Sequence, residues 1–151
     1  MTFEEFVATV GRQVRAGLVA ANGAQVGADA AAEAMAYAWE HWERVCAMDN
    51  PAGYLYRVGQ TAARRDRRHE HPDRLFPEPE PHDVEIEPGL LPALEHLSEM
   101  QRVCVVLVHG YGYGQTEAAE LLDISPSSVR THLDRGMRTL RVQLEVTHEH
   151  R

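Results

Sequence analysis

Arginine and hydroxyl side chains recur on one face of the segment that follows Pro126, at a spacing suited to contact with nucleic acid. Ser125 and Pro126 predict a helix start, because serine caps free N–H groups and proline fixes the φ of the first turn. Val129 and Leu133 then face inward at helical spacing. Arginine forks match phosphate oxygens and guanine edges, and hydroxyls match phosphates. The outward residues predicted to contact duplex DNA are Ser128, Arg130, Thr131, Asp134, Arg135 and Arg138.

A shorter helix is predicted directly before this segment. Gly114 and Glu117 have the spacing of a helix start in which a carboxylate reaches back to free N–H groups, and the helix should end near Leu122. Residues 123–125 are the turn length of a helix-turn-helix unit. Asp123 stands where many such turns have glycine, and aspartate tolerates a left-handed conformation at some cost. The residues expected to face inward are Ala118, Leu122, Ile124, Val129 and Leu133, and the alternative is a solvated amphipathic helix in a bundle.

A second basic stripe follows the helix start predicted at Asn50 and Pro51. Its arginines recur at steps of three and four beside an aromatic side chain and an amide. This combination suits a nucleic-acid strand whose bases stack while its phosphates follow the arginines. A solvated charge run is the alternative. The stripe consists of Arg57, Thr61, Arg64, Arg65 and Arg68, with Tyr54 and Gln60 nearby.

Acidity is concentrated in the middle of this chain of 151 residues and net charge −8. Residues 1–68 hold eight acidic and eight basic residues, residues 69–92 hold seven and one, and residues 93–151 hold eight and six. The segmental charges are therefore 0, −6 and −2, so a nucleic-acid partner remains compatible with the ends of the chain. Six prolines accompany the seven acids of the middle segment, which predicts an extended linker.

The remaining patterns predict an all-α chain built from two small helical domains and that Pro/acid-rich linker, the second domain ending in the helix-turn-helix. Thr2 and Glu5 have capping-box spacing at the first helix, and Trp39 and Trp42 recur at the helix period and suggest core. The predicted parts are a first domain at 1–68, a linker at 69–90, a second domain at 91–145 and a tail at 146–151.

Several classes of function are not favoured. The chain has no Gly-rich phosphate loop, nucleophile elbow or zinc-spaced cluster, so we expect neither an enzyme nor a cofactor. His69, His71 and His82 lack a cysteine partner, so no metal site is predicted. Cys46 and Cys104 are expected to be buried, reduced thiols, with a redox switch as the alternative. No apolar run is long enough for membrane insertion and the amino terminus is acidic, so we expect a cytoplasmic protein.

Two stretches together resemble the extracytoplasmic-function group of bacterial RNA polymerase sigma factors, within the sigma-70 family. The segment from Asn50 to Val58 is similar to the family's proline, aromatic and Leu-Tyr-Arg-Ile segment before a basic helix. The segment from Leu97 to Arg141 is similar to the family's order of leucine, turn, Gln-Arg and helix-turn-helix. The resemblance covers about residues 3–68 and 91–143. Two departures are Thr61, where relatives usually have asparagine, and the alanines at 30–32, where relatives are more polar.

The resemblance implies a role for each set of residues. The acidic linker would thread the polymerase channel for RNA. The second domain would read the minus-thirty-five element as duplex through Ser128, Arg130, Thr131, Asp134, Arg135 and Arg138. The residues implied to contact core polymerase are Asp29, Glu33 and Trp39. Those implied to capture and melt the minus-ten element are Tyr54, Arg57, Gln60, Thr61, Arg64 and Arg65.

Two functional hypotheses follow from these patterns. The first is a sigma factor that binds core polymerase and promoter DNA, with an anti-sigma factor as a further partner suggested by the resemblance. The second is a stand-alone helix-turn-helix regulator whose first domain serves dimerisation or ligand binding.

Overall fold

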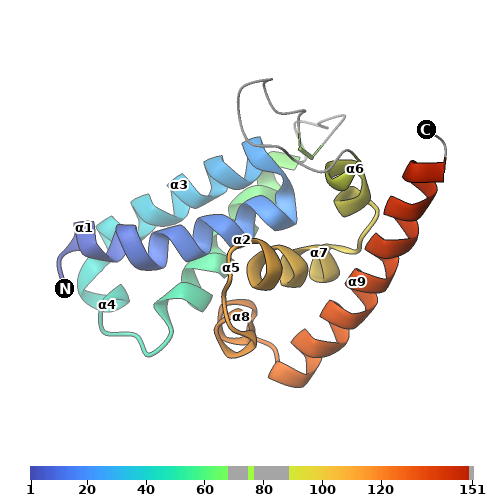
Figure 1. The fold of residues 1–151 in the computed structure, drawn as a ribbon. Coiled ribbons are helices and arrows are strands. Elements are labelled where there is room, and N and C mark those ends of the chain that lie inside the picture. Colours follow the sequence, from blue (N-terminus) through green and yellow to red (C-terminus); the bar gives the residue numbers. More distant parts are fainter. Residues whose placement is uncertain (68–74, 77–88, 150–151) are drawn as a thin grey trace.

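The computed structural model describes residues 1–67, 75–76 and 89–149, and every regular element within these ranges is a helix. The predicted all-α fold is therefore confirmed (Figure 1). Most of the predicted linker at 69–90, with His69, His71 and His82, lies outside the described residues. The division into separate domains stays a prediction.

The N-terminal half is built around three long helices. α2 and α3 form a hairpin whose turn is the single residue Gly23, at φ 92°. α5 packs against both of them. α1, the π-helical stretch after it and α2 form one continuous helical rod, called the first rod below. Helical dihedral angles are kept across both junctions. In chain order the elements are α1 (Phe3–Phe6), the π-helical Val7–Gly11, α2 (Arg12–Asn22), α3 (Ala24–Glu40), α4 (Trp42–Val45) and α5 (Pro51–Arg67).

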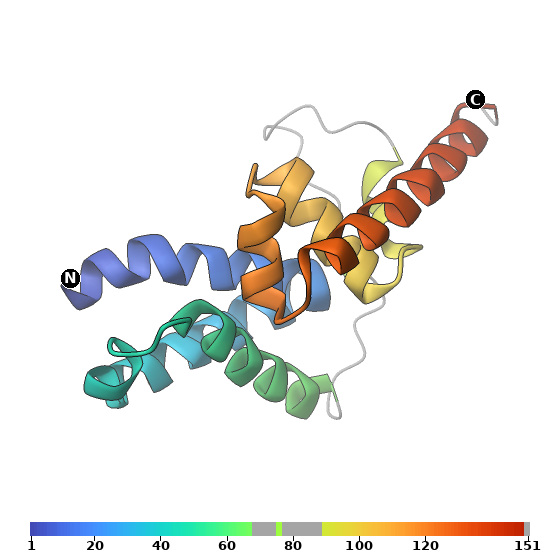
Figure 2. The same ribbon diagram turned by 90° about the horizontal axis from the view of Figure 1, so that it is seen from below.

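The C-terminal half contains the predicted helix-turn-helix. α8 and α9 pack against each other, α7 packs against α9, and the last turns of α9 project away from the rest of the molecule (Figure 2). α9 continues into the stretch 146–151 for which a tail was predicted. The elements are α6 (Leu90–Glu95), α7 (Glu99–Val105), the π-helical Val106–Gly110, α8 (Gln115–Leu122) and α9 (Pro126–Glu149).

The local start signals of these helices are confirmed. The backbone N–H of Glu5 donates to Thr2 Oγ1 at 3.2 Å, and the N–H of Thr2 donates back to the Glu5 carboxylate at 2.9 Å. At α9 the N–H of Ser128 donates to Ser125 Oγ at 3.1 Å. Asp123 ends α8 at φ 55°, which is the left-handed conformation expected for this turn.

The two halves share one buried core. Leu121 of α8 is 1% exposed and lies against Gly17 of α2 and the ring of Tyr56 of α5. A Cβ placed on Gly17 would lie 2.9 Å from Leu121 Cδ2 and 3.0 Å from Tyr56 Cε2. The absence of a side chain at Gly17 therefore lets α8 approach α2 and α5. The expectation that Leu122 would be the inward leucine of α8 needs qualification, because Leu122 is half-buried whereas Leu121 is fully buried.

A buried cation connects the same halves. Arg102 of α7 is 6% exposed, and its Nε and one terminal nitrogen donate to the carbonyl oxygens of Ala20 and Ala21 at 2.5 and 2.7 Å. Another terminal nitrogen donates to Leu97 O at 3.3 Å. The carbonyls of Ala20 and Ala21 belong to the last turn of α2, where helix carbonyls lack internal partners and a positive charge is favourable.

A short described segment between the halves also contacts both. The N–H of Ala24, at the start of α3, donates to Leu75 O at 2.9 Å. The N–H of Phe76 donates to the Glu95 carboxylate of α6 at 3.3 Å. Leu75 and Phe76 therefore bridge the α2–α3 turn and α6 from within the stretch predicted to be a linker.

Two sequence-based expectations of burial are wrong. Trp39 was expected to lie in the core, but it is 63% exposed, because only one edge of its indole packs, against Phe3. Cys46 was expected to be buried, but it is exposed, because it follows the short α4 at the edge of the bundle. Cys104 is buried as expected. None of the helices in the described ranges combines the length and the apolar character needed to span a bilayer.

We predict that Arg102→Met lowers the free energy of unfolding by about 2–4 kcal/mol, because buried carbonyls lose charged hydrogen-bond donors. Urea denaturation measures this difference. Arg141→Met is the matched control, since Arg141 is exposed on α9 and its replacement should change stability by less than about 0.5 kcal/mol. Equal denaturation midpoints for the two variants would contradict the role given to Arg102.

A second prediction concerns the thiols. Burial raises the pKa of Cys104 to about 11, so its reactive thiolate is scarce near neutral pH as well as inaccessible. Iodoacetamide should therefore modify Cys46 in the native protein and both cysteines in denaturant, as counted by mass spectrometry. Modification of Cys104 at the same rate as Cys46 in the native protein is the opposite outcome.

Candidate nucleic-acid interface

The outer face of α9 carries the first candidate surface. Arg130, Arg135 and Arg138 are exposed, and within the described ranges no carboxylate pairs with any of them. Val129 and Leu133, at 0% and 5% exposure, hold the opposite face in the core. The arginines are thus presented outward by a helix whose inner face is fixed.

The remaining predicted residues of α9 differ in their surroundings. Thr131 and Asp134 are exposed, whereas Ser128 is half-buried. The hydroxyl of Thr131 donates to Ser127 O at 3.1 Å, and Ser128 Oγ lies 2.9 Å from Ser125 Oγ. These hydroxyls are therefore part of the helix start as well as part of its outer face.

The outer face of α5 carries the second candidate surface. Arg57, Thr61, Arg64 and Arg65 are all exposed along it, as predicted. Two of the arginines are already paired with carboxylates from other helices. Arg57 lies 3.0 Å from Asp123, in the turn between α8 and α9, and Arg65 pairs with Glu33 of α3.

The amide of Gln60 is engaged inside the protein. Asn22 Nδ2 donates to Gln60 Oε1 at 2.7 Å, and Gln60 Nε2 donates to the Tyr56 hydroxyl at 3.1 Å. Burial raises the pKa of Tyr56, which keeps its hydroxyl protonated at neutral pH. Gln60 thus connects α2 to α5, a structural role that its position on the stripe did not indicate.

An aromatic and cationic cluster surrounds Tyr54 at the start of α5. The hydroxyls of Tyr54 and Tyr37 are 2.9 Å apart, and Arg44 Cζ lies 5.9 and 5.8 Å from the two ring centroids. His41 stacks on Tyr37 with the centroids 4.1 Å apart. The pKa of Tyr37 is raised, mainly because its hydroxyl shares a hydrogen bond with Tyr54. Such rings and a guanidinium suit stacking with an unpaired base.

Sequence reasoning identified Tyr54 in this cluster and missed the other three members. Tyr37 and His41 are four residues apart on a helix, a spacing that places two rings on one face and could have been noticed. Arg44 could not have been assigned to it from spacing, because the turn after α3 determines where it points.

The residues predicted to contact polymerase lie along α3 but have unlike environments. Asp29 is exposed and accepts hydrogen bonds from Gln25 Nε2 at 3.1 and 3.3 Å. Glu33 forms the pair with Arg65 described above. Trp39 is 63% exposed, with one edge against Phe3 at a centroid distance of 4.9 Å.

An open groove of about 440 Å³ lies between α3 and the continuous helix formed by residues 3–22. Its walls are mainly small apolar side chains, with guanidinium groups among them. The residues that shape it include Val7, Gly11, Arg12, Arg15, Ala32 and Met35. The N-terminal half thus presents an apolar groove and an exposed indole, while the arginines of α5 lie on another helix packed against α2 and α3.

The structure brings parts of the predicted sites together. Glu33, from the polymerase set, touches Arg65, from the minus-ten set, and Arg57 of the minus-ten set touches the helix-turn-helix at Asp123. No metal-binding group of three or more His, Cys, Asp or Glu side chains occurs in the part of the chain that the structure describes.

Comparison with known proteins gives two findings. Residues 90–140 match the family model described as "Sigma-70, region 4". The whole fold is similar to that of the sigma factor RpoE from Bartonella quintana, solved in a co-crystal with the anti-sigma factor NepR. The TM-score is 0.71 at 17% sequence identity, and the similarity covers 95% of this chain and 97% of that one. No curated protein sequence matches the chain significantly.

Proposed function

We propose that this chain is an RNA polymerase sigma factor of the sigma-70 family and that it directs promoter-specific initiation through the arginine faces of α5 and α9. The resemblance to the extracytoplasmic-function group is supported by the region 4 match and by a fold similar to that of a sigma factor over almost the whole chain. A sigma factor is an initiation factor and not an enzyme. The observation that carries the assignment is the coincidence of the region 4 match with the predicted helix-turn-helix.

In this proposal α9 reads the minus-thirty-five element as duplex. The support is that Arg130, Arg135 and Arg138 are exposed, unpaired by carboxylates within the described ranges, and anchored by a buried inner face. Arginine reaches guanine edges and phosphates with two parallel hydrogen bonds, which lysine cannot form. Ser128, Thr131 and Asp134 complete the proposed contact face, with the hydroxyls near phosphates.

The face of α5 takes the minus-ten strand once it is unpaired. Arg57, Arg64 and Arg65 would follow phosphates, and Tyr54 would offer a ring for stacking beside Tyr37. Thr61 stays part of the proposed face because it is exposed. Gln60 would act through its support of α5, since both ends of its amide already have partners inside the protein.

Core polymerase is proposed to bind along α3 at Asp29, Glu33 and Trp39, beside the groove that runs between α3 and the first rod. The support is Trp39, left 63% exposed on α3, the helix that also forms one wall of the apolar groove, since exposed aromatic side chains are typical anchors of protein interfaces. Binding to polymerase implies a cytoplasmic location.

An anti-sigma factor is the further proposed partner. The sigma factor with the similar fold was solved bound to one, and that likeness is the basis for the proposal here. The alternative of a stand-alone regulator has no comparable support, because the fold similarity extends over the N-terminal half as well as the helix-turn-helix.

We predict that Arg130→Ala and Arg135→Ala each lower promoter affinity of the reconstituted holoenzyme by about 5- to 100-fold, the loss expected for a specific arginine contact. Gel shifts with a promoter selected by the holoenzyme from randomised DNA measure this, and run-off transcription follows initiation. Arg141→Ala removes the same charge from an exposed position on the same helix and should change affinity less than twofold.

The wild-type chain in the same experiment tests whether this protein is a sigma factor. Specific run-off transcripts that depend on adding the chain to core polymerase support it. A folded wild-type chain that neither binds core polymerase nor changes transcript start sites contradicts it.

A further inference from the structure

We propose that the free chain associates with a second copy of itself: the projecting end of α9 of one copy docks in the groove between the first rod and α3 of the other. This inference concerns the protein without DNA or polymerase, and it does not rest on the proposed function. The part of α9 that docks, called the α9 end below, presents Val142, Glu145, Val146 and Glu149.

The groove suits a row of side chains from another helix. Gly11, Ala28 and Ala32 are among the residues that line it, and side chains this small let a second helix approach closely. Val7 and Met35 add larger apolar surface. A helix is about 10 Å across, so an open groove of about 440 Å³ takes one ridge of its side chains and not the whole helix.

The same groove carries positive charge. Arg12 and Arg15 are exposed, line the groove from one face of the first rod, and form no ion pair with a carboxylate within the described ranges. No acidic side chain is among the described residues that line the groove. The groove therefore favours an occupant that is apolar along its ridge and acidic beside it.

The α9 end has that chemistry. Val142 and Val146 are one helical turn apart and are 53% and 46% exposed. Glu145 and Glu149 are exposed next to them, and no basic side chain in the described part of the chain forms an ion pair with either. Carboxylates near a helix C-terminus are unfavourably placed, because the carbonyl groups there already carry partial negative charge. Guanidinium groups from another molecule would stabilise this end.

The contact must join two molecules. The last turns of α9 project on one side of the molecule, and the first rod and α3 lie on the other side (Figures 1 and 2). α9 is one continuous helix from Pro126 to Glu149, so its end does not fold back onto the groove of its own chain. The two surfaces are different patches, so the association is head-to-tail, and each copy offers one groove and one α9 end.

The association is expected to be weak. One ridge with two valines buries less surface than the roughly 1,200–2,000 Å² of stable complexes. Ion pairs that stay open to water add little and are screened by salt. We therefore expect dimers and short oligomers whose population rises with protein concentration and falls with ionic strength.

Two charge-reversed variants of the full chain test this contact. The groove variant carries Arg12→Glu and Arg15→Glu, and the end variant carries Glu145→Arg and Glu149→Arg. Each variant alone places like charges across the proposed contact. An equimolar mixture places opposite charges at both kinds of contact, because the acidic groove of one meets the basic end of the other, and the reverse. All four side chains are exposed on helices, so the fold should be kept.

Two further variants separate charge from apolar contact. Arg64→Glu with Arg130→Glu is the matched control, since it changes net charge as the groove variant does, at exposed positions outside both surfaces. Val142→Asn with Val146→Asn removes the apolar ridge without changing charge.

Sedimentation equilibrium at low salt, over a range of protein concentrations, measures self-association. We expect the mass of wild type to rise with concentration, and the dissociation constant to increase at least about fivefold in the groove variant, the end variant and the asparagine variant. The control and the equimolar mixture should stay within about twofold of wild type.

Three results would overturn the inference. One is a wild-type protein that remains monomeric up to about 1 mM, the weak limit of measurable association. Another is a groove or end variant that associates as the control does. The third is a mixture that associates no better than its two components, because only a head-to-tail contact is restored by mixing. No DNA or polymerase is present, so these results leave the proposed function to its own test.

Discussion

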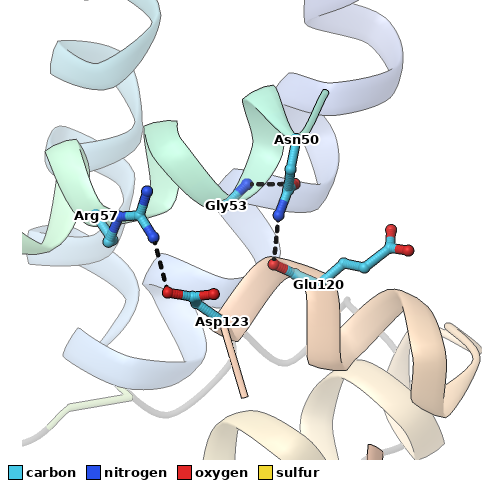
Figure 3. Close-up of polar contacts among 5 residues, drawn as sticks. All are labelled: Asn50, Gly53, Arg57, Glu120 and Asp123. Atoms are coloured by element: carbon cyan, nitrogen blue, oxygen red, sulfur yellow. Dashed lines mark hydrogen bonds and ion pairs between the residues drawn. The ribbon is translucent and has the colours of Figure 1, made fainter. Parts of the chain in front are cut away.

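The fit of Leu121 against Gly17 and Tyr56 is the contact on which the arrangement of the two halves depends. It places α8, the first helix of the helix-turn-helix, directly on α2 and α5. Asn50 reaches Glu120 O, and Arg57 reaches Asp123, because α8 lies this close to α5, and these two contacts form a polar edge beside the buried layer (Figure 3). A residue with a larger side chain at position 17 would move α8 outward and break the polar edge with it. The polar contacts are therefore consequences of an apolar fit.

The energies of the two layers differ in a way that suits a reversible assembly. Full burial of a leucine contributes about 1.5–3 kcal/mol, and hydrogen bonds from a buried guanidinium contribute about 1.5–3 kcal/mol. The exposed pair at the edge contributes at most about 1 kcal/mol. Partners that bind one half more tightly when it is released, such as polymerase or a promoter strand, must overcome the buried layer. The exposed Arg57–Asp123 pair then affects how readily Arg57 is released to bind another anion.

The features that sequence analysis predicted correctly are local ones. Capping at Thr2 and Ser125 depends on residues three positions apart, so the chain itself brings the partners together. The helix-turn-helix was predicted because only three residues separate two segments with helical periodicity. The left-handed conformation of Asp123 was expected because Asp123 lies in that turn. The outward arginines of α9 followed from the inward Val129 and Leu133.

The features that it missed depend on contacts far apart in the chain. Periodicity within α8 favoured Leu122 as the inward leucine, because no local pattern shows that a second helical layer covers Leu121. The partner of Asp123 is 66 residues away, and the two α2 carbonyls bound by Arg102 are 81 and 82 residues away. Cys46 was misplaced because its exposure depends on where α4 ends, not on the apolar residues around it.

We expect the two halves that pack together in the free chain to separate when they hold a promoter on polymerase. Energy transfer between dyes on Cys46 and on a cysteine replacing the exposed Val142 measures their separation directly. We expect high transfer in the free chain and a clear fall when core polymerase and promoter DNA are both added. Unchanged transfer in complexes that go on to initiate transcription would contradict it.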